Sequence, residues 1–290
     1  MAYYKMPSLY NPFGVLYNPA SISRNFRILI EGRLFSANDL HFSDGLWLSL
    51  DHHTTFSDPD KRKTLEKINS SLSDAVTFLK KSSYLFLTFG TAWIYIYRKS
   101  GTVAANCHKI RQSEFERRLL QPEEIIKDYT GLLNELRDFN PDLNVIFTIS
   151  PIRHFKDGAF YNQVSKSVLF LAVHSLLQRF DFTSYFPAYE IFMDELRDYR
   201  FYTDDMLHPS SQGVSYVWER FCEAYLDGSS KEIMSSVEKI RRAASHRPFR
   251  TETTEYKKFV TTILSQIEQI QKRHPFLNFE EEVKKLTSSI

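Results

Sequence analysis

The chain has 290 residues, of which 42% are hydrophobic and 25% are charged, an ordinary composition for one large globular domain or two smaller ones. Its formal net charge is only +2, so no overall field draws it to nucleic acid or to an anionic membrane, and neither is predicted as a partner. Two cysteines, Cys107 and Cys222, are too few for a disulfide framework, which favours a reducing compartment.

Neither the first residues nor the apolar runs indicate export or membrane anchoring. The opening MAYYKMPSLYNPFG has no apolar signal segment, and the longest apolar run, Val168 to Val173, is far too short to span a bilayer. The expected location is therefore the cytoplasm.

Helix-like and strand-like segments alternate through the first part of the chain. Residues 65–81 and 122–137 repeat apolar side chains at helical spacing. Each of these segments precedes a short apolar run, 84–89 or 144–150, that is typical of a buried parallel strand. This alternation predicts right-handed crossovers and an α/β fold with a parallel, doubly wound sheet.

The same alternation continues with a helix over 163–180, a strand over 184–190 and a helix over 210–226. From Gly228 onward the strand patterns disappear. We therefore predict an α/β domain over residues 1–228.

Residues 229–290 read as a charged helical extension, with 12 Lys and Arg against 8 Asp and Glu. One helical stripe in this segment is apolar, and it must be buried against the domain, neighbouring helices or another subunit. We favour burial within the chain over a dimer contact. The stripe consists of Phe259, Val260, Ile263, Leu264, Ile267 and Ile270.

Polar residues follow the predicted strands at their carboxyl ends, where open α/β sheets place ligands. These candidate residues are Gly90, Thr91, Asn106, His108, Arg153, His154, Asp205 and His208. Asp205 and His208 are three residues apart, so on one turn the carboxylate can hold an imidazole N–H and fix its tautomer. The alternative is that Asp205 caps a turn and His208 is a packed loop residue.

Seven short blocks carry a resemblance to a known family. They are NPFGVLYNPASI, WLSLDHHTTFS, LTFGTAWIY, VAANCHK, SPIRHFKDGA, YFPAYEIFMDELRDYRFY and DDMLHPS. Together they resemble the bacterial GSCFA domain family, which is similar to the SGNH/GDSL-type hydrolases. The resemblance runs from the first residues to about Phe221.

This resemblance implies a three-layer α/β/α, flavodoxin-like (SGNH-type) fold and hydrolysis of an acyl or carbohydrate ester by a serine nucleophile. In that scheme His208 is the general base, Asp205 orients it, and Gly14 and Gly90 lie near the oxyanion hole. The implied partner is a small-molecule or glycan ester, and no cofactor is implied. The exact substrate and the oligomeric state stay open.

The serine itself is the missing part. The family is named for a Gly-Ser-Cys-Phe-Ala block that supplies it, and no GSC or GDS string occurs in this sequence. MAYYKM resembles the last turn of the helix after that block, so we expect a chain cut inside its first helix and inactive as written. Ala92 stands where the SGNH pattern has an oxyanion Asn, which leaves Asn106 as the substitute.

Three other serines, Ser43, Ser57 and Ser150, lie near family blocks. None of them sits in a strand-to-helix elbow that would expose and activate its hydroxyl. We interpret each as a turn or capping serine.

A metal-assisted hydrolase is a second candidate class, because a bound divalent ion generates hydroxide without a serine. Adjacent histidines point in different directions in regular structure, and no HxH or HExxH spacing occurs. Hydrogen-bonded histidines lining a polar pocket are therefore the favoured interpretation, and no metal site is predicted. The side chains concerned are His52, His53, His108, His154, Asp205 and His208.

A non-enzymatic remnant that binds a glycan or peptide is the third class. Trp47, Trp93 and Tyr95 would form its stacking floor, although aromatic residues usually fill cores. Arg153 and Lys156 are candidates for holding an anionic group, with solvated loop charges as the equal alternative.

Overall fold

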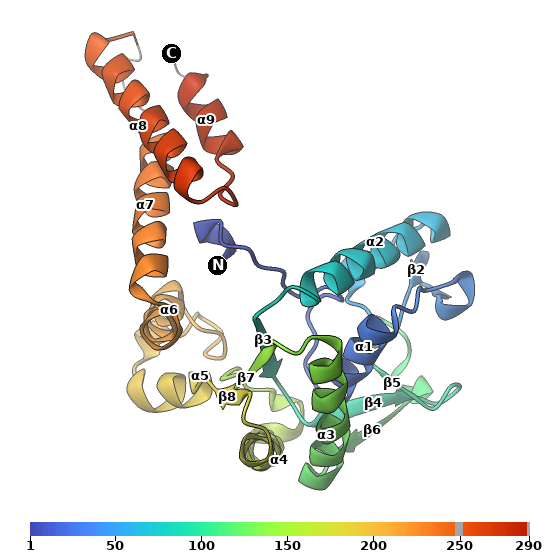
Figure 1. Cartoon of the computed structure of the whole chain (residues 1–290). Coiled ribbons are helices and arrows are strands. Elements are labelled where there is room, and N and C mark those ends of the chain that lie inside the picture. Colours follow the sequence, from blue (N-terminus) through green and yellow to red (C-terminus); the bar gives the residue numbers. More distant parts are fainter. Residues whose placement is uncertain (247–251, 289–290) are drawn as a thin grey trace. The chain divides into compact units, whose positions relative to one another are not determined.

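The computed structural model describes residues 1–246 and 252–288 and forms two compact units. One unit is Leu9–Val217, and the other combines Met1–Ser8 with Trp218–Ile290. The division falls inside helix α6 (Ser211–Tyr225), whereas the sequence places the boundary at residue 228. Figure 1 follows the elements along the chain.

A parallel three-stranded sheet organises the unit Leu9–Val217. Its order is β3 (Tyr84–Phe89), β7 (Asn144–Ile149) and β8 (Thr183–Tyr185). In β7 every residue after Asn144 is buried, which explains the continuous apolar run in its sequence. The predicted α/β fold with a parallel sheet is confirmed.

The last strand is shorter than the sequence predicts. Residues 184–190 were expected to be a strand, but β8 ends at Tyr185 and Ala188–Glu190 form a short helix, α5. Pro187 separates the two, because proline has no N–H to donate to a strand ladder. A π-helical turn, Ile191–Glu195, follows.

Four helices accompany the sheet: α1 (Pro19–Glu31), α2 (Lys61–Leu79), α3 (Pro122–Phe139) and α4 (Gly158–Arg179). Asn18 begins α1, its side chain accepting a hydrogen bond from the Ser21 N–H at 2.8 Å. Residues of α3 and α4 pack with β3 and β7 in one core, in which Tyr129, Leu133 and Phe147 are fully buried. Val168, Leu169 and Ala172 of α4 belong to this core, which fixes the sheet to the middle of that helix.

Two antiparallel sheets were not predicted. The first pairs β1 (His41–Ser43) with β2 (Leu46–Leu48), and the second has the order β5 (Thr102–Ala104), β4 (Trp93–Tyr97), β6 (Phe115–Leu119). No strand was predicted between Gly90 and the helix that begins at Pro122. The alternating run WIYIY instead forms the central strand of the second sheet.

The second unit contains α7 (Gly228–Ser245), α8 (Thr254–Arg273) and α9 (Glu280–Thr287). The apolar stripe of α8 packs against α7 and α9 within the chain, with Val260, Ile267 and Ile270 buried. Of the three partners that the sequence left open, the domain, neighbouring helices and another subunit, the structure shows the neighbouring helices.

Residues 1–8 belong to this helical unit through a buried ion pair. The Lys5 amino group lies 2.9 Å from Oε2 of Glu282, which is 3% exposed, and Arg241 lies 3.5 Å from the other carboxylate oxygen. The Lys5 amino group also lies 5.2 Å from the ring centroid of Phe279. One carboxylate in α9 therefore joins α7 and the N-terminal segment.

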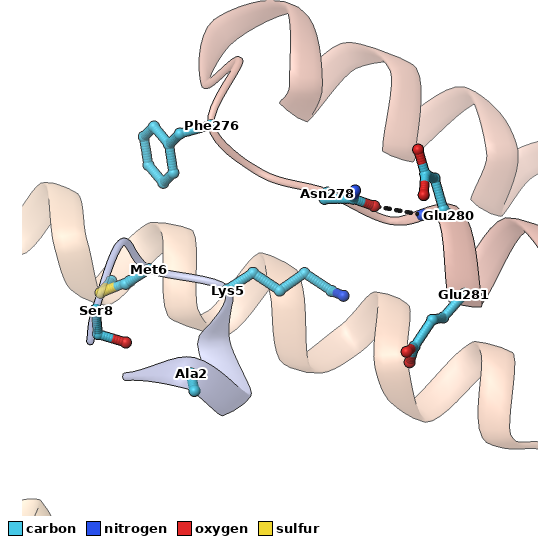
Figure 2. Close-up of a pocket in the computed structure, with 8 residues that line it drawn as sticks. All are labelled: Ala2, Lys5, Met6, Ser8, Phe276, Asn278, Glu280 and Glu281. Atoms are coloured by element: carbon cyan, nitrogen blue, oxygen red, sulfur yellow. Dashed lines mark hydrogen bonds between the residues drawn. The ribbon is translucent and has the colours of Figure 1, made fainter. Parts of the chain in front are cut away.

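A cavity of about 370 Å³ opens in the same unit, lined by residues that include Lys5, Met6, Phe276 and Glu281 (Figure 2). None of the site residues predicted from the sequence lines it. Among the described residues, no helix combines the length and apolar character that a bilayer span requires.

Candidate functional site

Asp205 and His208 form a hydrogen-bonded pair in the loop before α6. Oδ2 of Asp205 lies 2.6 Å from Nδ1 of His208, and both side chains are about half exposed. No hydrogen bond from residues 1–246 or 252–288 reaches Nε2 of His208. When Nδ1 donates to the carboxylate, Nε2 keeps a lone pair that can accept a proton.

The loop that holds this pair closes on itself. A backbone bridge joins Tyr202 to Pro209, and the Thr203 N–H donates to the His208 carbonyl at 2.8 Å. Met206 takes a left-handed conformation with φ of 58°, which turns the chain between the two partners. The three-residue spacing therefore yields a side-chain contact, as the sequence predicts.

Asp205 is held in its ionised form. Its Oδ1 accepts hydrogen bonds from the His208 N–H at 2.9 Å, the Leu207 N–H at 2.8 Å and the Thr203 hydroxyl at 2.8 Å. The backbone hydrogen bond from His208, followed by the ring of His208 and the other donors, holds the pKa of Asp205 well below its usual range. At neutral pH Asp205 is therefore a carboxylate that can orient the imidazole.

His154 is a second histidine in the same electrostatic neighbourhood. Its ring meets Tyr17 edge-on with 5.9 Å between centroids, and its backbone N–H donates to Oδ1 of Asn162 at 2.9 Å. His154 is an exposed residue overall, yet the packing around it still removes part of the water from its ring. That desolvation, followed by the charges of Lys166 and His208, lowers the pKa of His154.

Gly90 and Thr91 follow β3, but their backbone donors are already engaged. Both N–H groups donate to the Tyr17 carbonyl, at 2.8 and 3.0 Å. The Thr91 hydroxyl lies 3.0 Å from the Ser165 hydroxyl. An oxyanion at Gly90 would have to replace the Tyr17 carbonyl, so the oxyanion roles of these two residues stay predictions.

The first turns of α4 carry a polar face that the sequence analysis missed. Asn162, Ser165 and Lys166 are 6%, 2% and 1% exposed, and they lie at helical spacing. The Lys166 amino group donates to the Gly90 and Ser150 carbonyls, both at 2.6 Å. In the sequence, the spacing of Asn162, Ser165 and Lys166 just before the apolar part of the helix could have indicated this polar face.

Arg153 and Lys156 lie in the loop after β7. A guanidinium N–H of Arg153 donates to the Met193 sulfur at 3.2 Å, and no carboxylate of the described chain pairs with this arginine. Lys156 donates to the Tyr95 hydroxyl at 2.8 Å. Arg153 therefore stays a candidate for an anionic group, and Lys156 is tied to β4.

The tryptophans proposed as a stacking floor are partly covered. The guanidinium carbon of Arg117 lies 4.0 Å from the Trp93 ring centroid, and Arg117 also forms a two-pronged ion pair with Asp157. The amino group of Lys61 lies 4.3 Å from the ring centroid of Trp47. One face of each indole is thus occupied by a cation from its own chain.

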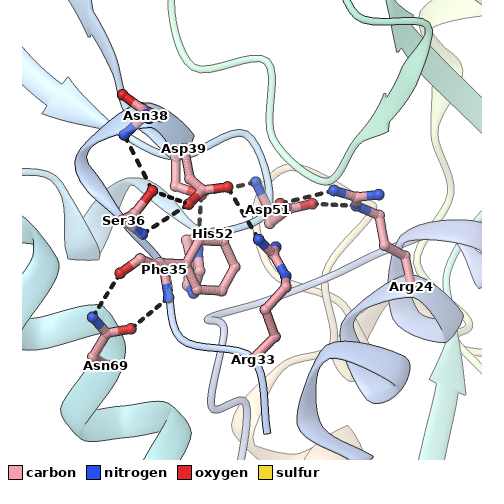
Figure 3. A network of polar contacts seen from close by, with 10 residues as sticks. Arg24, Arg33, Phe35, Ser36, Asn38, Asp39, Asp51, His52 and Asn69 are labelled. Carbon is pink, nitrogen blue, oxygen red and sulfur yellow. Dashed lines mark hydrogen bonds and ion pairs between the residues drawn. The ribbon is translucent and has the colours of Figure 1, made fainter. Parts of the chain in front are cut away.

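His52 is a core histidine and does not belong with the Asp205 loop. It is 1% exposed, its Nδ1 lies 2.9 Å from the Ser49 hydroxyl, and its ring contacts Phe13 and Phe35. Burial lowers the pKa of His52 to about 3. Figure 3 shows this histidine beside a polar network that includes the Arg24–Asp51 ion pair.

His108 and Asn106 hold this second region together. The His108 ring bonds the Ser49 carbonyl through Nε2 at 2.8 Å, and the His108 N–H donates to Oδ1 of Asn106 at 2.7 Å. Within the described chain, no hydrogen bond or ring contact joins His52, His108 or Asn106 to His208. Their substrate-binding roles stay predictions, and hydrogen bonding explains each of them structurally.

Gly14 lies in the same region and has a packing reason to be glycine. Its φ is +79°, and an added Cβ would come 2.1 Å from the His53 Cβ. Its N–H donates to the Asn11 carbonyl at 2.7 Å. The conformation and the close approach explain why a glycine is needed here, and its oxyanion role stays a prediction.

No serine or cysteine of the described chain is paired with His208. The Ser150 hydroxyl accepts the Ile152 N–H at 3.2 Å, which is a turn contact. Cys107 and Cys222 are free thiols. Burial raises the pKa of Cys107 to about 11, so it stays protonated at neutral pH.

Residues 1–246 and 252–288 contain no group of three or more His, Cys, Asp or Glu side chains arranged to hold a metal ion. The histidines considered for a metal site are divided among the Ser49 region, the loop after β7 and the Asp205 loop. The pairing of Asp205 with His208 is thus the arrangement with the clearest chemistry.

Comparison with known proteins agrees with this organisation. A family model described as the GSCFA family matches residues 1–221, and one described as the GSCFA domain protein, C-terminal domain, matches residues 237–290. No curated protein and no solved structure shows a significant match. The chain belongs to the GSCFA family.

Proposed function

We propose that this protein is an ester hydrolase of the SGNH/GDSL type, in which His208 is the general base and Asp205 orients it. The observation that carries the proposal is the 2.6 Å contact between Oδ2 of Asp205 and Nδ1 of His208, with Nε2 pointing to no partner in the described chain. An imidazole held in this way is what a hydroxyl nucleophile needs to lose its proton.

The reaction follows from these two side chains. Nε2 of His208 takes the proton of a serine hydroxyl as its oxygen attacks the ester carbonyl, and Asp205 stabilises the imidazolium that forms. The imidazolium then gives the proton to the leaving alcohol. Water, deprotonated by the same nitrogen, releases the acid and restores the serine.

No serine that the structure describes is placed as a nucleophile beside His208. The sequence has no GSC or GDS string, and Ser150 is engaged in a turn. We therefore expect residues 1–290 to show no serine-dependent turnover on their own. The substrate class is an acyl or carbohydrate ester, and Arg153 is the candidate contact for an anionic group on it.

Fluorophosphonate labelling and hydrolysis of p-nitrophenyl acyl esters and acetylated sugars test this function. They are measured on recombinant residues 1–290 and on the protein made in its native host, each with and without His208→Gln. We expect the native-host activity to fall about 10²–10⁴-fold in the variant, the usual contribution of a general base. Labelling of residues 1–290 at Ser43, Ser57 or Ser150, or activity that ignores His208→Gln, would contradict it.

The two other function classes receive less support. A metal-assisted hydrolase needs a group of ligands that the described residues do not assemble, and near one zinc or manganese per purified chain would reverse that ranking. A glycan-binding role needs an open aromatic face, which Arg117 partly covers at Trp93. Loss of glycan binding in a folded Trp93→Ala variant would favour it.

A further inference from the structure

Arg117 of β6 is held by aromatic rings and by a carboxylate at the same time. It lies directly across from Tyr95 in the register of β4 and β6, and its guanidinium carbon lies 4.0 Å from the Trp93 ring centroid. Both terminal guanidinium nitrogens donate to Asp157, one to each carboxylate oxygen. Stacking and two parallel hydrogen bonds fix a planar guanidinium in one orientation, so Arg117 is a rigid support.

Asp157 belongs to the loop after β7 and is placed to cap helix α4. It is the N-cap residue of that helix, yet its side chain accepts no hydrogen bond from the first turn. An aspartate that caps its own helix ordinarily stabilises it by about 1 kcal/mol. The carboxylate binds Arg117 instead, and the preceding residue, Lys156, donates to the Tyr95 hydroxyl at 2.8 Å. Two neighbouring side chains therefore tie this loop to the antiparallel sheet.

An earlier residue of the same loop contacts the support of the Asp205 loop. A guanidinium N–H of Arg153 donates to the Met193 sulfur at 3.2 Å. Met193 packs against the apolar cluster that contains Phe192, and the Phe192 ring meets Tyr202 edge-on with 4.8 Å between centroids. The backbone bridge that closes the Asp205 loop begins at Tyr202. A short series of contacts thus joins Arg153 to the candidate site.

We infer that Arg117 is a positioning residue of the proposed hydrolytic site. Through Asp157 it fixes the loop after β7, and thereby the place of Arg153 beside the Asp205 loop. This inference deepens the proposed function and rests on it, because it gives the antiparallel sheet a part in substrate selection. The favoured substrate is an ester that carries a second, anionic group, which the Arg153 guanidinium binds through charge-assisted hydrogen bonds.

Methyl NMR of the methionines in residues 1–290 tests the positioning without a substrate. The chain has five methionines, so methyl-¹³C labelling gives few signals, and the Met193 methyl is bonded to the sulfur that Arg153 contacts. We expect Arg117→Gln to move the Met193 signal toward its position in Arg153→Gln, and the double variant to move it no further. Arg118→Gln is the matched control, since this neighbour on β6 forms an exposed two-pronged ion pair with Glu124 and should leave Met193 unchanged.

The native-host protein adds a readout on the substrate. We expect the KM for mono-p-nitrophenyl adipate, an anionic ester, to rise about tenfold in Arg117→Gln and in Arg153→Gln, as for the loss of one charge-assisted hydrogen bond. The KM for p-nitrophenyl hexanoate, a neutral ester of the same chain length, should not change in either variant. A general loss of structure would instead affect both esters alike.

A Met193 signal that stays in place in folded Arg117→Gln, or that moves equally in Arg118→Gln, overturns the inference, and so does an equal rise of KM for both esters. If Arg117→Gln does not fold, Asp157→Asn breaks the same ion pair from the loop side and carries the same expectations, because asparagine can still cap α4. Absence of ester turnover would reject the proposed function alone, since the Met193 signal still decides whether Arg117 positions Arg153.

Discussion

Asp205 binds both the backbone and the ring of His208. Its Oδ1 accepts the His208 N–H at 2.9 Å, and its Oδ2 meets Nδ1 of the same residue at 2.6 Å. One carboxylate therefore fixes the position and the orientation of the imidazole. Because the loop between them is closed by the Thr203 N–H to His208 carbonyl bond, the arrangement is complete without contributions from other elements.

Replacement of the orienting carboxylate is the first prediction. Asp205→Asn keeps the size of the side chain but loses the charge, so the imidazole is no longer held in the tautomer that leaves Nε2 as a base. We expect any ester turnover or fluorophosphonate labelling of the native-host protein to fall by about 10²-fold or more. Asp204→Asn is the matched control, because this neighbouring carboxylate does not contact the ring, and equal losses in both variants would contradict the assignment.

The buried His52 makes stability fall in acid. Its pKa is about 3 in the folded chain against 6.5 when exposed, so between those values the unfolded chain binds a proton that the folded chain refuses. We expect its contribution to cost about 2 kcal/mol of unfolding free energy at pH 5 relative to pH 7. Urea unfolding at both pH values measures this, and His52→Gln should remove most of the difference. The same pH dependence in wild type and variant would show that His52 is not buried.

The carboxylate of Glu282 is expected to hold residues 1–8 to the helical unit. Glu282→Gln leaves the amino group of Lys5 and the guanidinium of Arg241 without their partner, which should cost about 3 kcal/mol of unfolding free energy. The exposed neighbour Glu281 gives the control, and Glu281→Gln should change stability by less than about 0.5 kcal/mol. Similar midpoints for the two variants in denaturant unfolding would rule out the buried ion pair.

Gly14 and Gly45 allow the packing argument to be tested by comparison. Both have positive φ, but only Gly14 has a neighbour within reach, since a Cβ at Gly45 meets nothing within 4 Å. Gly45→Ala should cost about 1 kcal/mol for the backbone conformation alone. We expect Gly14→Ala to cost at least about 2 kcal/mol more, because His53 must move. Equal thermal stability of the two variants would remove the packing explanation.

Much of the fold could be predicted because its signals are local. The apolar runs Tyr84–Phe89 and Asn144–Ile149 are strands at those positions, and the helix predicted from residue 122 begins at Pro122. The antiparallel sheet around β4 was not predicted, because no strand was assigned to the WIYIY run. Strand pairing between distant segments is not visible in the periodicity of either segment.

The candidate site, like the fold, could be predicted only where neighbours in the sequence determine the contacts. The Asp205–His208 contact could be predicted because three residues of separation in a tight turn bring the side chains together. The split between His52 and His154 could not, since it depends on how distant segments pack. Lys166 was overlooked because a lysine within a helix is ordinarily a surface residue.

The most direct test of His208 as the general base is to determine which ring nitrogen carries the proton when the ring is neutral. Two-dimensional ¹H–¹⁵N NMR of the folded chain distinguishes a proton on Nδ1 from one on Nε2 without any substrate. We predict that neutral His208 carries its proton on Nδ1, shared with Asp205, and that Asp205→Asn removes this preference. A proton on Nε2 in the wild type would leave no lone pair facing a nucleophile and would contradict the assignment of His208 as the general base.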